Sequence, residues 1–372
     1  MIKNILVLED SSKAKFGGGQ KVTLEVIDAL KNEYNLYLVD CSQDSIFKQK
    51  AKVFLKGILS LSCYGKVIGG EKSAFSLGLK EITVSPFLYI QNIIKVLSFI
   101  KSNDFTNNNT LIYATTKKQL LLSWILKKLT NIKYIYHAHA FDDRKSLFFK
   151  LIYPAYKQAD NIICVSNLIK NNINLPNCQT IYNPIKAIET KTKTIKNKDK
   201  IIISSFSTLI KLKGIEYFMQ SFEYLQNKEK VEFWIFGDGS EKEYLKQFTN
   251  EKVILKGFAS NSEELMLNDI DIVVVSSITE EACPMVPLEA FKCGVPVIST
   301  NIGGQAEIVK DEEVGLFVDI KNPEQIAQKI DFLIENSDIY EKLSKNAIKY
   351  SKNFDINEYH INVLNIFKEI EL

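Results

Sequence analysis

Short, almost continuously apolar runs alternate with stretches that carry apolar residues at helical spacing along most of the chain. In the first half the apolar runs are NILVLED, NLYLVD, TLIYAT, KYIYHAH and NIICVS, and helical patterns such as KVTLEVIDAL and QLLLSWILKKL separate them. Strands that are apolar on both faces and alternate with helices are typical of a parallel sheet covered by helices on each side. The pattern therefore predicts a doubly wound α/β domain over residues 1–184.

A polar stretch interrupts this alternation at residues 185–200. The segment KAIETKTKTIKNKDK holds six lysines and three threonines without apolar periodicity, which is typical of a solvated linker. The alternation then restarts with KIIISSFS and VEFWIFG and predicts a second doubly wound domain over residues 201–354. Residues 355–372 are helical in pattern, and we expect this helix to cross back to the first domain. Ligands of such sheets bind at the carboxyl ends of the strands, so we expect a cleft between the domains there.

Composition agrees with a protein of about two globular domains. The 372 residues are 46% hydrophobic and 24% charged, and the net charge of +3 does not favour nucleic acid as a partner. The longest apolar runs fall short of the ~20 residues of a membrane-spanning helix. The first residues, MIKNILVLED, form a strand pattern rather than a signal peptide, and six scattered cysteines contain no C-x-x-C pair. We therefore expect a cytoplasmic protein with reduced thiols.

The segment TEEACPMVPLEAFKCGVPVIST places Glu281 and Glu289 on either side of two prolines, directly after the apolar strand DIVVVSS. We expect Pro287 to be the first residue of a helix, which puts Glu289 in its first turn beside unpaired amide groups. Such a loop can hold a diphosphate on its amides while a carboxylate accepts hydrogen bonds from ribose hydroxyls. The alternative to a binding site is that Glu289 is an ordinary acidic residue at a helix start and that Glu281 is an acidic residue of a surface loop.

The same segment resembles the donor-site signature of the retaining glycosyltransferases of family 4, which have the GT-B fold. The E-x7-E spacing is followed by AFKCGVPVISTNIGGQAEIV, and the resemblance extends to LIKLKGIEYF, WIFGDGSEKEYL, VILKGF and GLFVDIKNPEQIAQKI. In the first half, GGGQ, KYIYHAHAF, ADNIICVSN and IYNPI also fit. The resemblance covers most of the chain in the right order, and it implies two Rossmann-like domains that face a cleft.

The resemblance also implies roles for residues of the second domain. Glu289 would hold the ribose of a nucleotide sugar, and Glu281 would face the hydroxyls of the transferred sugar. Lys213 would neutralise the diphosphate leaving group, where negative charge develops. The matching donor-binding positions also include Gly237, and the loop amides of Met285 and Val286 complete the set.

In the first domain, the turn FGGGQ follows the first strand and permits close approach of a ligand to the start of a helix at Gly18 and Gly19. A simple tight turn is the alternative. His139 aligns with a strand-final histidine that contacts the sugar or the acceptor in the family. His137 lies two positions earlier, but no third metal ligand has suitable spacing, so we expect no metal site.

Two positions depart from the family pattern. The family usually places an arginine five residues before the lysine, and this chain has Thr208 there. A planar donor that can bind a phosphate with two hydrogen bonds is therefore missing. The acidic loop has Cys283 and Pro284 where E-x-F-G is more common. Lys211 is a candidate substitute for the arginine, although its spacing from Lys213 turns the two side chains apart in a regular element.

The resemblance implies a transferase that moves a sugar from a UDP- or GDP-linked donor to a glycan or lipid-linked acceptor with retention of configuration, without a metal ion or other cofactor. Surface polysaccharide or glycan biosynthesis is the common setting. A non-catalytic partner subunit with the GT-B fold and a nucleotide-sugar epimerase are the alternatives.

One further stretch suggests a contact with a membrane. Read as a helix, residues 47–59 (FKQKAKVFLKGIL) have an apolar face flanked by lysines. The apolar positions are Phe47, Ala51, Phe54, Leu55 and Ile58, and the lysines are Lys48, Lys52 and Lys56. This pattern predicts either peripheral contact with an anionic membrane or an ordinary surface helix.

Overall fold

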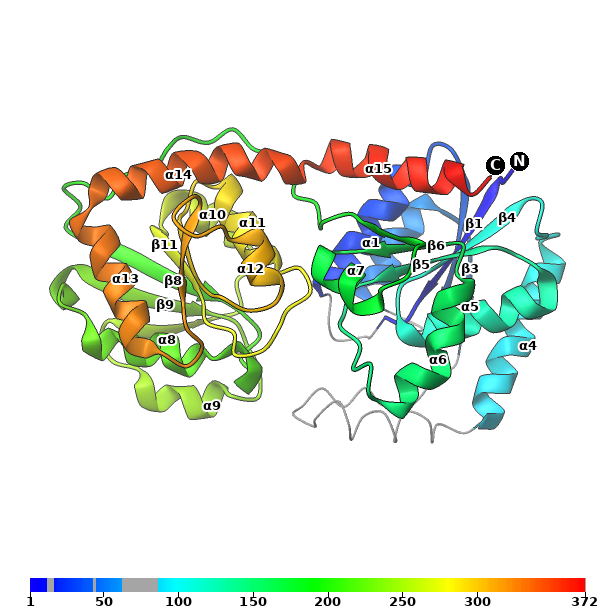
Figure 1. The fold of residues 1–372 in the computed structure, drawn as a ribbon, viewed down its shortest axis with the longest axis horizontal. Coiled ribbons are helices and arrows are strands. Elements are labelled where there is room, and N and C mark those ends of the chain that lie inside the picture. Colours follow the sequence, from blue (N-terminus) through cyan, green and yellow to red (C-terminus); the bar gives the residue numbers. More distant parts are fainter. Residues whose placement is uncertain (12–16, 43–44, 62–85, 372) are drawn as a thin grey trace. The chain divides into compact units, whose positions relative to one another are not determined.

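The computed structural model describes residues 1–11, 17–42, 45–61 and 86–371, and the chain forms two compact units (Figure 1). The first unit contains Met1–Pro184 together with Ile356–Leu372, and the second contains Ile185–Asp355. Each unit is built on a parallel sheet packed with helices. The predicted fold class, two Rossmann-like parallel-sheet domains, is confirmed.

The described residues of the first unit form a seven-stranded sheet in the order β3-β2-β1-β4-β5-β6-β7. Its strands are β1 (Asn4–Glu9), β2 (Asn35–Asp40), β3 (Leu55–Ser60), β4 (Thr110–Ala114), β5 (Tyr134–Ala138), β6 (Asn161–Cys164) and β7 (Cys178–Thr180). Its helices are α1 (Gly18–Leu30), α2 (Ile46–Ala51), α4 (Pro86–Ser102), α5 (Lys117–Thr130), α6 (Leu147–Gln158), α7 (Asn167–Ile173) and α15 (Ile356–Glu369). All pairings are parallel, so the carboxyl ends of the strands share one edge.

The second unit repeats this order with β10-β9-β8-β11-β12-β13. Its strands are β8 (Ile201–Phe206), β9 (Val231–Phe236), β10 (Val253–Gly257), β11 (Ile272–Val275), β12 (Val297–Thr300) and β13 (Gly315–Val318). Its helices are α8 (Ile215–Ser221), α9 (Lys242–Leu245), α10 (Ser262–Asn268), α11 (Met285–Lys292), α12 (Gly304–Ile308), α13 (Pro323–Glu335) and α14 (Ser337–Ser351). In both units the chain order reverses beside the first strand, between β1 and β4 and between β8 and β11.

The C-terminal helix α15 completes the first unit. Its buried residues Tyr359, Val363, Ile366 and Phe367 belong to the same apolar core as the buried face of α1. The Tyr34 hydroxyl donates a hydrogen bond of 2.6 Å to Glu371, just beyond the helix. The last residues of the chain therefore pack against an element near its beginning, as Figure 1 shows for the red and blue helices. No helix among the described residues is both long and apolar enough to cross a membrane.

Residues 185–200 belong to the second unit rather than forming a free linker. Ile195 is only 4% exposed and lies in the core of this unit, although the surrounding sequence is polar. The Lys193 ammonium donates 2.7 Å to the carbonyl of Ile270, and Lys198 forms an ion pair of 2.5 Å with the buried Asp271. The core residue Ile195 and two long cationic side chains thus hold the segment on the unit, which composition alone did not reveal.

The amphipathic helix expected over residues 47–59 does not form. Helix α2 ends at Ala51, one 3₁₀ turn follows over Lys52–Phe54, and Leu55–Ser60 form the edge strand β3. Phe47 and Ala51 are buried in the core of the first unit. The helical interpretation failed because Leu55, Ile58 and Leu59 pair with β2, a tertiary contact that overrides their local helical pattern. The apolar residues therefore face the protein rather than one common exposed surface.

We expect Ile195→Ala to destabilise the second unit by about 2–4 kcal/mol, because it leaves a cavity at a buried site. Lys196→Ala, at the exposed neighbouring position, should change stability by less than about 0.5 kcal/mol. Urea unfolding in a Trp124→Phe background isolates the fluorescence of Trp234, which lies in β9 of this unit. Equal stability of the two variants would show that residues 185–200 are a free linker.

Candidate functional site

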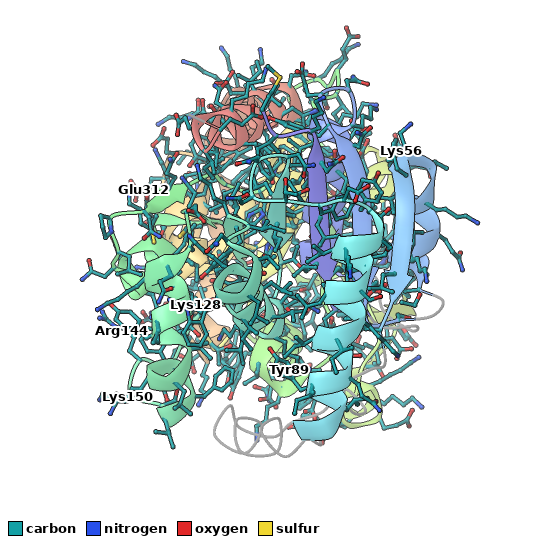
Figure 2. All side chains as sticks on the ribbon, turned by 90° about the vertical axis from the view of Figure 1, so that its right-hand side faces the viewer. Lys56, Tyr89, Lys128, Arg144, Lys150 and Glu312 are labelled. Atoms are coloured by element: carbon teal, nitrogen blue, oxygen red, sulfur yellow. The ribbon has the colours of Figure 1, made fainter. Side chains whose placement is uncertain are left out.

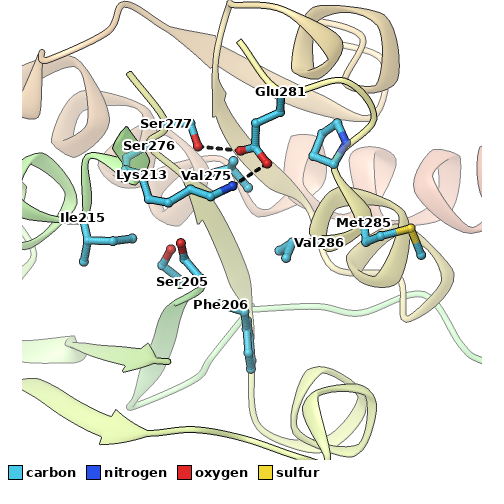
Figure 3. Close-up of a pocket in the computed structure, with 12 residues that line it drawn as sticks. Ser205, Phe206, Lys213, Ile215, Val275, Ser276, Ser277, Glu281, Met285 and Val286 are labelled. Carbon is cyan, nitrogen blue, oxygen red and sulfur yellow. Dashed lines mark hydrogen bonds and ion pairs between the residues drawn. The ribbon is translucent and has the colours of Figure 1, made fainter. Parts of the chain in front are cut away.

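A pocket in the second unit opens at the carboxyl ends of β8 and β11 (Figure 3). Residues 205–207 and 275–277 line it from these two strands, and Lys213, Ile215, Glu281 and residues 284–286 complete the lining. Open α/β sheets bind ligands where the strand order reverses, because the loops of the two central strands diverge there. The pocket occupies this position of the sheet.

Glu281 receives three hydrogen-bond donors in the pocket. The Lys213 ammonium lies 2.5 Å from one carboxylate oxygen, and the Ser277 hydroxyl donates 2.6 Å to the other (Figure 3). The Gln305 amide also donates to this second oxygen, at 3.1 Å. The structure thus brings together two of the three predicted catalytic residues, Glu281 and Lys213. Ser277 and Gln305 were not predicted, although Gln305 lies inside the NIGGQAEIV motif.

Two glycines explain how the loop of Glu281 reaches this position. Gly304 begins α12, and its N–H donates 2.7 Å to the carbonyl of Glu281. A Cβ atom on Gly304 would lie 2.4 Å from the carbonyl oxygen of Ala282. Gly303 has φ +59° and leaves equally little room beside Glu280. The glycine pair therefore lets the start of α12 press directly against the acidic loop.

Lys213 is aimed by a tight turn before α8. Residues Lys211–Lys213 form one 3₁₀ turn, and Gly214 follows with φ +58°. The Ser276 hydroxyl donates 3.2 Å to the carbonyl of Lys213, which ties this turn to the end of β11. Lys211 instead lines a separate depression beside Glu216 and Glu241. Lys211 therefore does not supply a second cation to the pocket.

Thr208 lies just outside the pocket lining. Residues 205–207 line the pocket, but Thr208 is exposed and does not. Its carbonyl accepts hydrogen bonds from the Ile210 N–H and the Ser207 hydroxyl. The position that usually carries an arginine in family 4 thus contributes no side chain to the pocket.

Helix α11 begins two residues earlier than we expected. Met285 is its first residue after Pro284, so Pro287 is the third residue and not the first. The prediction of Glu289 in the first turn is therefore wrong, because Glu289 is the fifth residue. A proline is tolerated at the third position since that N–H also lacks a partner within a helix. Met285 and Val286 line the pocket, whereas Glu289 is half-buried on α11 and is not part of the lining.

Gly237 shapes the pocket through the backbone. It has φ +145°, and a Cβ atom there would lie 1.8 Å from the carbonyl oxygen of Ser207. The Ser207 N–H donates 3.0 Å to the carbonyl of Phe236, so the loops after β8 and β9 pack backbone to backbone. Gly237 therefore fixes the wall at Ser207 without lining the pocket itself.

In the first unit, two histidine rings lie against each other at the carboxyl end of β5, tilted by 32°. The ring centroids of His137 and His139 are 4.1 Å apart, and the Tyr113 hydroxyl lies 2.6 Å from Nδ1 of His137. Burial lowers the pKa of His137 well below its ordinary value and that of His139 to about 4. Both rings are therefore neutral at pH 7. Nε2 of each ring is buried without a hydrogen-bond partner within the described structure.

The glycine turn lies beside the ring of His139 at Gly19. This proximity is expected if Gly18, Gly19 and His139 line one site. A Cβ atom on Gly19 would lie 3.8 Å from the ring of His139. Gly18 is the first residue of α1, and both glycines are exposed. Phe16 of the FGGGQ motif lies outside the described residues. The start of α1 thus lies beside the end of β5, at the carboxyl edge of the first sheet.

Glu9 is a functional candidate that the sequence analysis did not identify. It ends β1 and is buried, and the Thr23 hydroxyl lies 3.2 Å from its carboxylate and 3.1 Å from the carbonyl of Gly19. Burial raises the pKa of Glu9 to about 7. The available signal was an acid that ends an apolar strand, in LVLED, at the edge where ligands bind.

Metal-ligating side chains meet elsewhere in the first unit. Carboxylates of Glu25 and Asp28 on α1 and a ring nitrogen of His360 on α15 all lie within 4.8 Å of one another. Among the described residues, no third ligand of this kind joins His137 and His139. The absence of a metal requirement stays a prediction.

Comparison with known proteins agrees with this geometry. Residues 187–350, which contain the pocket and its loops, match the family of glycosyl transferases group 1. The uncharacterized glycosyltransferase MJ1607 of Methanocaldococcus jannaschii is 27% identical over 233 residues, 56% of this chain and 59% of that protein. The N,N'-diacetylbacillosaminyl-diphospho-undecaprenol alpha-1,3-N-acetylgalactosaminyltransferase of Campylobacter jejuni is 28% identical over 201 residues, 53% of this chain and 52% of that protein. The matches thus span little more than half of these relatives.

Solved structures relate the chain to the fold of known glycosyltransferases. Among solved structures, HepE of Anabaena in complex with UDP superposes with a TM-score of 0.79 at 18% sequence identity, covering 98% of this chain and all of that chain. At this identity the likeness establishes the GT-B fold alone. Within that glycosyltransferase fold, the Lys213–Glu281 pocket lies in the region of residues 187–350 that matches group 1.

We expect Glu9→Gln to change how the stability of the first unit depends on pH. The raised pKa of Glu9 means that the folded protein keeps this proton up to about pH 7, while the unfolded chain loses it near 4.5. The free energy of unfolding therefore falls between these pH values and is constant above them. The variant lacks this loss, so its stability relative to wild type should rise by roughly 2–3 kcal/mol from pH 4.5 to 7.

Urea unfolding in a Trp234→Phe background measures this difference, because Trp124 on α5 then reports on the first unit. Glu33→Gln, at an exposed position, is the matched control and should show no such trend. A constant difference between Glu9→Gln and wild type over this range would contradict a protonated Glu9.

Proposed function

We propose that this chain is a retaining glycosyltransferase of the family 4 type. It transfers a sugar from a UDP- or GDP-linked donor to a glycan or lipid-linked acceptor. The observation that carries the proposal is the Lys213–Glu281 pair at the strand-order reversal of the second unit, inside the region that matches group 1. The HepE structure is a complex with UDP, which supports a nucleotide-linked donor. The name of the Campylobacter relative includes a sugar joined to diphospho-undecaprenol, which supports a lipid-linked acceptor.

The donor diphosphate would bind between Lys213 and the start of α11. The amides of Met285 and Val286 belong to the first turn of that helix, where N–H groups lack partners within the helix. Pro284 and Pro287 donate no backbone hydrogen bond, so these two amides are the adjacent donors of the turn. A departing nucleoside diphosphate gains negative charge, which a fixed ammonium and aligned amides stabilise where it forms.

Donor binding requires Lys213 to exchange partners. In the structure its ammonium is bound to Glu281, and the proposal directs it to a phosphate oxygen instead. Glu281 stays in place because Ser277 and Gln305 continue to donate to its other oxygen. The released oxygen can then accept a hydrogen bond from a hydroxyl of the sugar.

Glu289 would accept hydrogen bonds from the ribose. Its position in the second turn of α11 lies one turn beyond the amides that we assign to the diphosphate. A helix rises about 5.4 Å per turn, which separates a ribose site from a phosphate site along the same helix. The early start of α11 thus agrees with a ribose role better than with a phosphate role.

In the first unit, His139 would contact the transferred sugar or the acceptor. Its neutral ring has an unpartnered Nε2, which can donate or accept one hydrogen bond but carries no charge. His137 supports it by ring contact and is itself held by Tyr113. We assign His139 to hydrogen bonding and the charge neutralisation to Lys213.

We further propose attack on the face that the leaving group departs from, with retention of configuration. The leaving phosphate helps to deprotonate the acceptor hydroxyl, and no metal ion or other cofactor takes part. The setting would be surface polysaccharide or lipid-linked glycan assembly on the cytoplasmic side of a membrane. A non-catalytic subunit with this fold is the second candidate, favoured by Thr208, which provides no side chain to the pocket.

Calorimetric titration with UDP, GDP, ADP, CMP and their sugar conjugates tests the proposal. We expect saturable binding of one nucleotide class, weakened about tenfold or more by Lys213→Ala and by Glu289→Ala. Thr208→Arg should tighten binding by supplying the missing bidentate donor. Lys211→Ala is the matched control, because that lysine lines a different depression, and it should bind like wild type.

Three results would contradict parts of the proposal. If the Glu289→Ala variant binds the nucleotide with unchanged affinity, Glu289 does not hold the ribose. No binding of any nucleotide at millimolar concentration would favour the non-catalytic candidate, and donor turnover without an acceptor would favour an epimerase.

A further inference from the structure

Helix α6 of the first unit exposes apolar side chains on its outer face. Phe149, Ile152, Ala155 and Tyr156 are buried on the inner face of this helix. On the outer face, Leu147 is 70% exposed and Leu151 is 57% exposed. They are four residues apart and therefore lie one above the other on the helix surface. Two exposed leucines in one line need an explanation that a single exposed leucine does not.

Cations outnumber acids around these leucines, and the exposed Asp143 before Arg144 is the acidic residue beside them. Arg144 and Lys145 lie in the loop before α6, and Lys150 lies between the two leucines, all three exposed. From Arg144 to Gln158 the sequence contains no acidic residue. Figure 2 shows Arg144 and Lys150 extending outward on the same side of the molecule. No ion pair within the described structure involves these three cations, so their charge is available to a partner.

We propose that the outer face of α6, defined by Arg144, Lys145, Leu147, Lys150 and Leu151, binds an anionic lipid surface. The leucines would enter the boundary between headgroups and acyl chains, and the cations would contact the negative headgroups. A second copy of this chain fits less well, because a two-fold contact would bring the same cations face to face. The complementary partner is a surface that is apolar and negative at once, and an anionic bilayer has both properties.

This surface replaces the stretch that the sequence pattern suggested. In residues 47–59 the apolar residues Phe47 and Ala51 are buried, and the lysines are divided among the short helix α2, a single 3₁₀ turn and the strand β3. Helix α6 instead buries one apolar face and exposes a second one with cations. Because lipid binding by α6 needs no nucleotide, this proposal is tested separately from the proposed transferase activity.

Sedimentation of the purified full chain with sucrose-loaded vesicles tests the surface. We expect binding to vesicles of phosphatidylglycerol and phosphatidylcholine, with binding to pure phosphatidylcholine weaker by about tenfold or more. The variants L147S/L151S and R144Q/K145Q/K150Q should each lower the partition coefficient by about tenfold or more, and the charge variant should also weaken its dependence on salt. Circular dichroism and urea unfolding in the Trp234→Phe background, which reports on the first unit, establish that each variant is folded.

The triple variant K52Q/V53S/K56Q is the matched control. Val53 is 79% exposed, and both lysines beside it are exposed, so the variant removes the same kinds of side chain from the 47–59 stretch. It should bind vesicles like wild type. Equal binding to neutral and anionic vesicles, no binding at all, or a loss caused by the control instead of the α6 variants would overturn the proposal. Self-association that the L147S/L151S variant abolishes, without vesicle binding, would assign the face to a second copy.

Discussion

Lys213 and Glu281 meet because the loops after two neighbouring parallel strands turn toward each other at the point where the strand order reverses. The lysine belongs to the connection that leaves β8, and the glutamate follows β11. Gly214 allows the first loop to lie against Ser276, and Gly304 allows α12 to press on the second. A Cβ atom at either glycine would collide with a carbonyl oxygen of the opposite segment. The ion pair is thus the result of close backbone packing, and the arrangement of the pocket depends on it.

The two units carry different chemistry at the carboxyl edges of their sheets. The second unit presents an ammonium, a carboxylate and the first turn of a helix, which suit a ligand with a charged diphosphate. The first unit presents His137 and His139, which burial keeps neutral at pH 7, and Glu9, whose pKa burial raises to about 7, so that it is partly protonated there. Neutral groups of this kind recognise hydroxyls by hydrogen bonds without attracting counterions. One sheet order repeated twice thus carries charged groups at the edge of one sheet and mostly neutral groups at the edge of the other.

Much of this organisation could be predicted from the sequence. Apolar strands alternating with helical patterns predicted both sheets, because burial on two faces leaves no polar alternation in a strand. The E-x7-E spacing and the lysine before α8 identified two residues that the structure brings within 2.5 Å. The glycine pair Gly303 and Gly304 is also a signal of a close approach of two backbone segments, since few other residues fit at such a position.

Other features depended on tertiary contacts that local patterns do not contain. Residues 185–200 appeared to be a linker because only one of them, Ile195, joins the core cluster of the second unit, within an otherwise polar run. Leu55 and Ile58 fit a helix with Phe47 in projection, but pairing with β2 places them in a strand. The start of α11 was misplaced because a proline is tolerated at any of the first helical positions. Glu9 was overlooked since its burial, which gives it its interest, is a property of the folded unit.

The affinity of Glu281→Gln for UDP tests the central claim most directly. If Lys213 exchanges Glu281 for the diphosphate, removing the negative charge of Glu281 frees the ammonium while Ser277 can still donate to the remaining carbonyl oxygen. UDP lacks the sugar that Glu281 is proposed to bind, so its affinity should rise by about threefold to tenfold, the size expected for releasing a partly exposed ion pair. Adding Lys213→Ala should abolish the gain. An unchanged or lower affinity in Glu281→Gln, with Lys213→Ala binding UDP like wild type, would contradict the account.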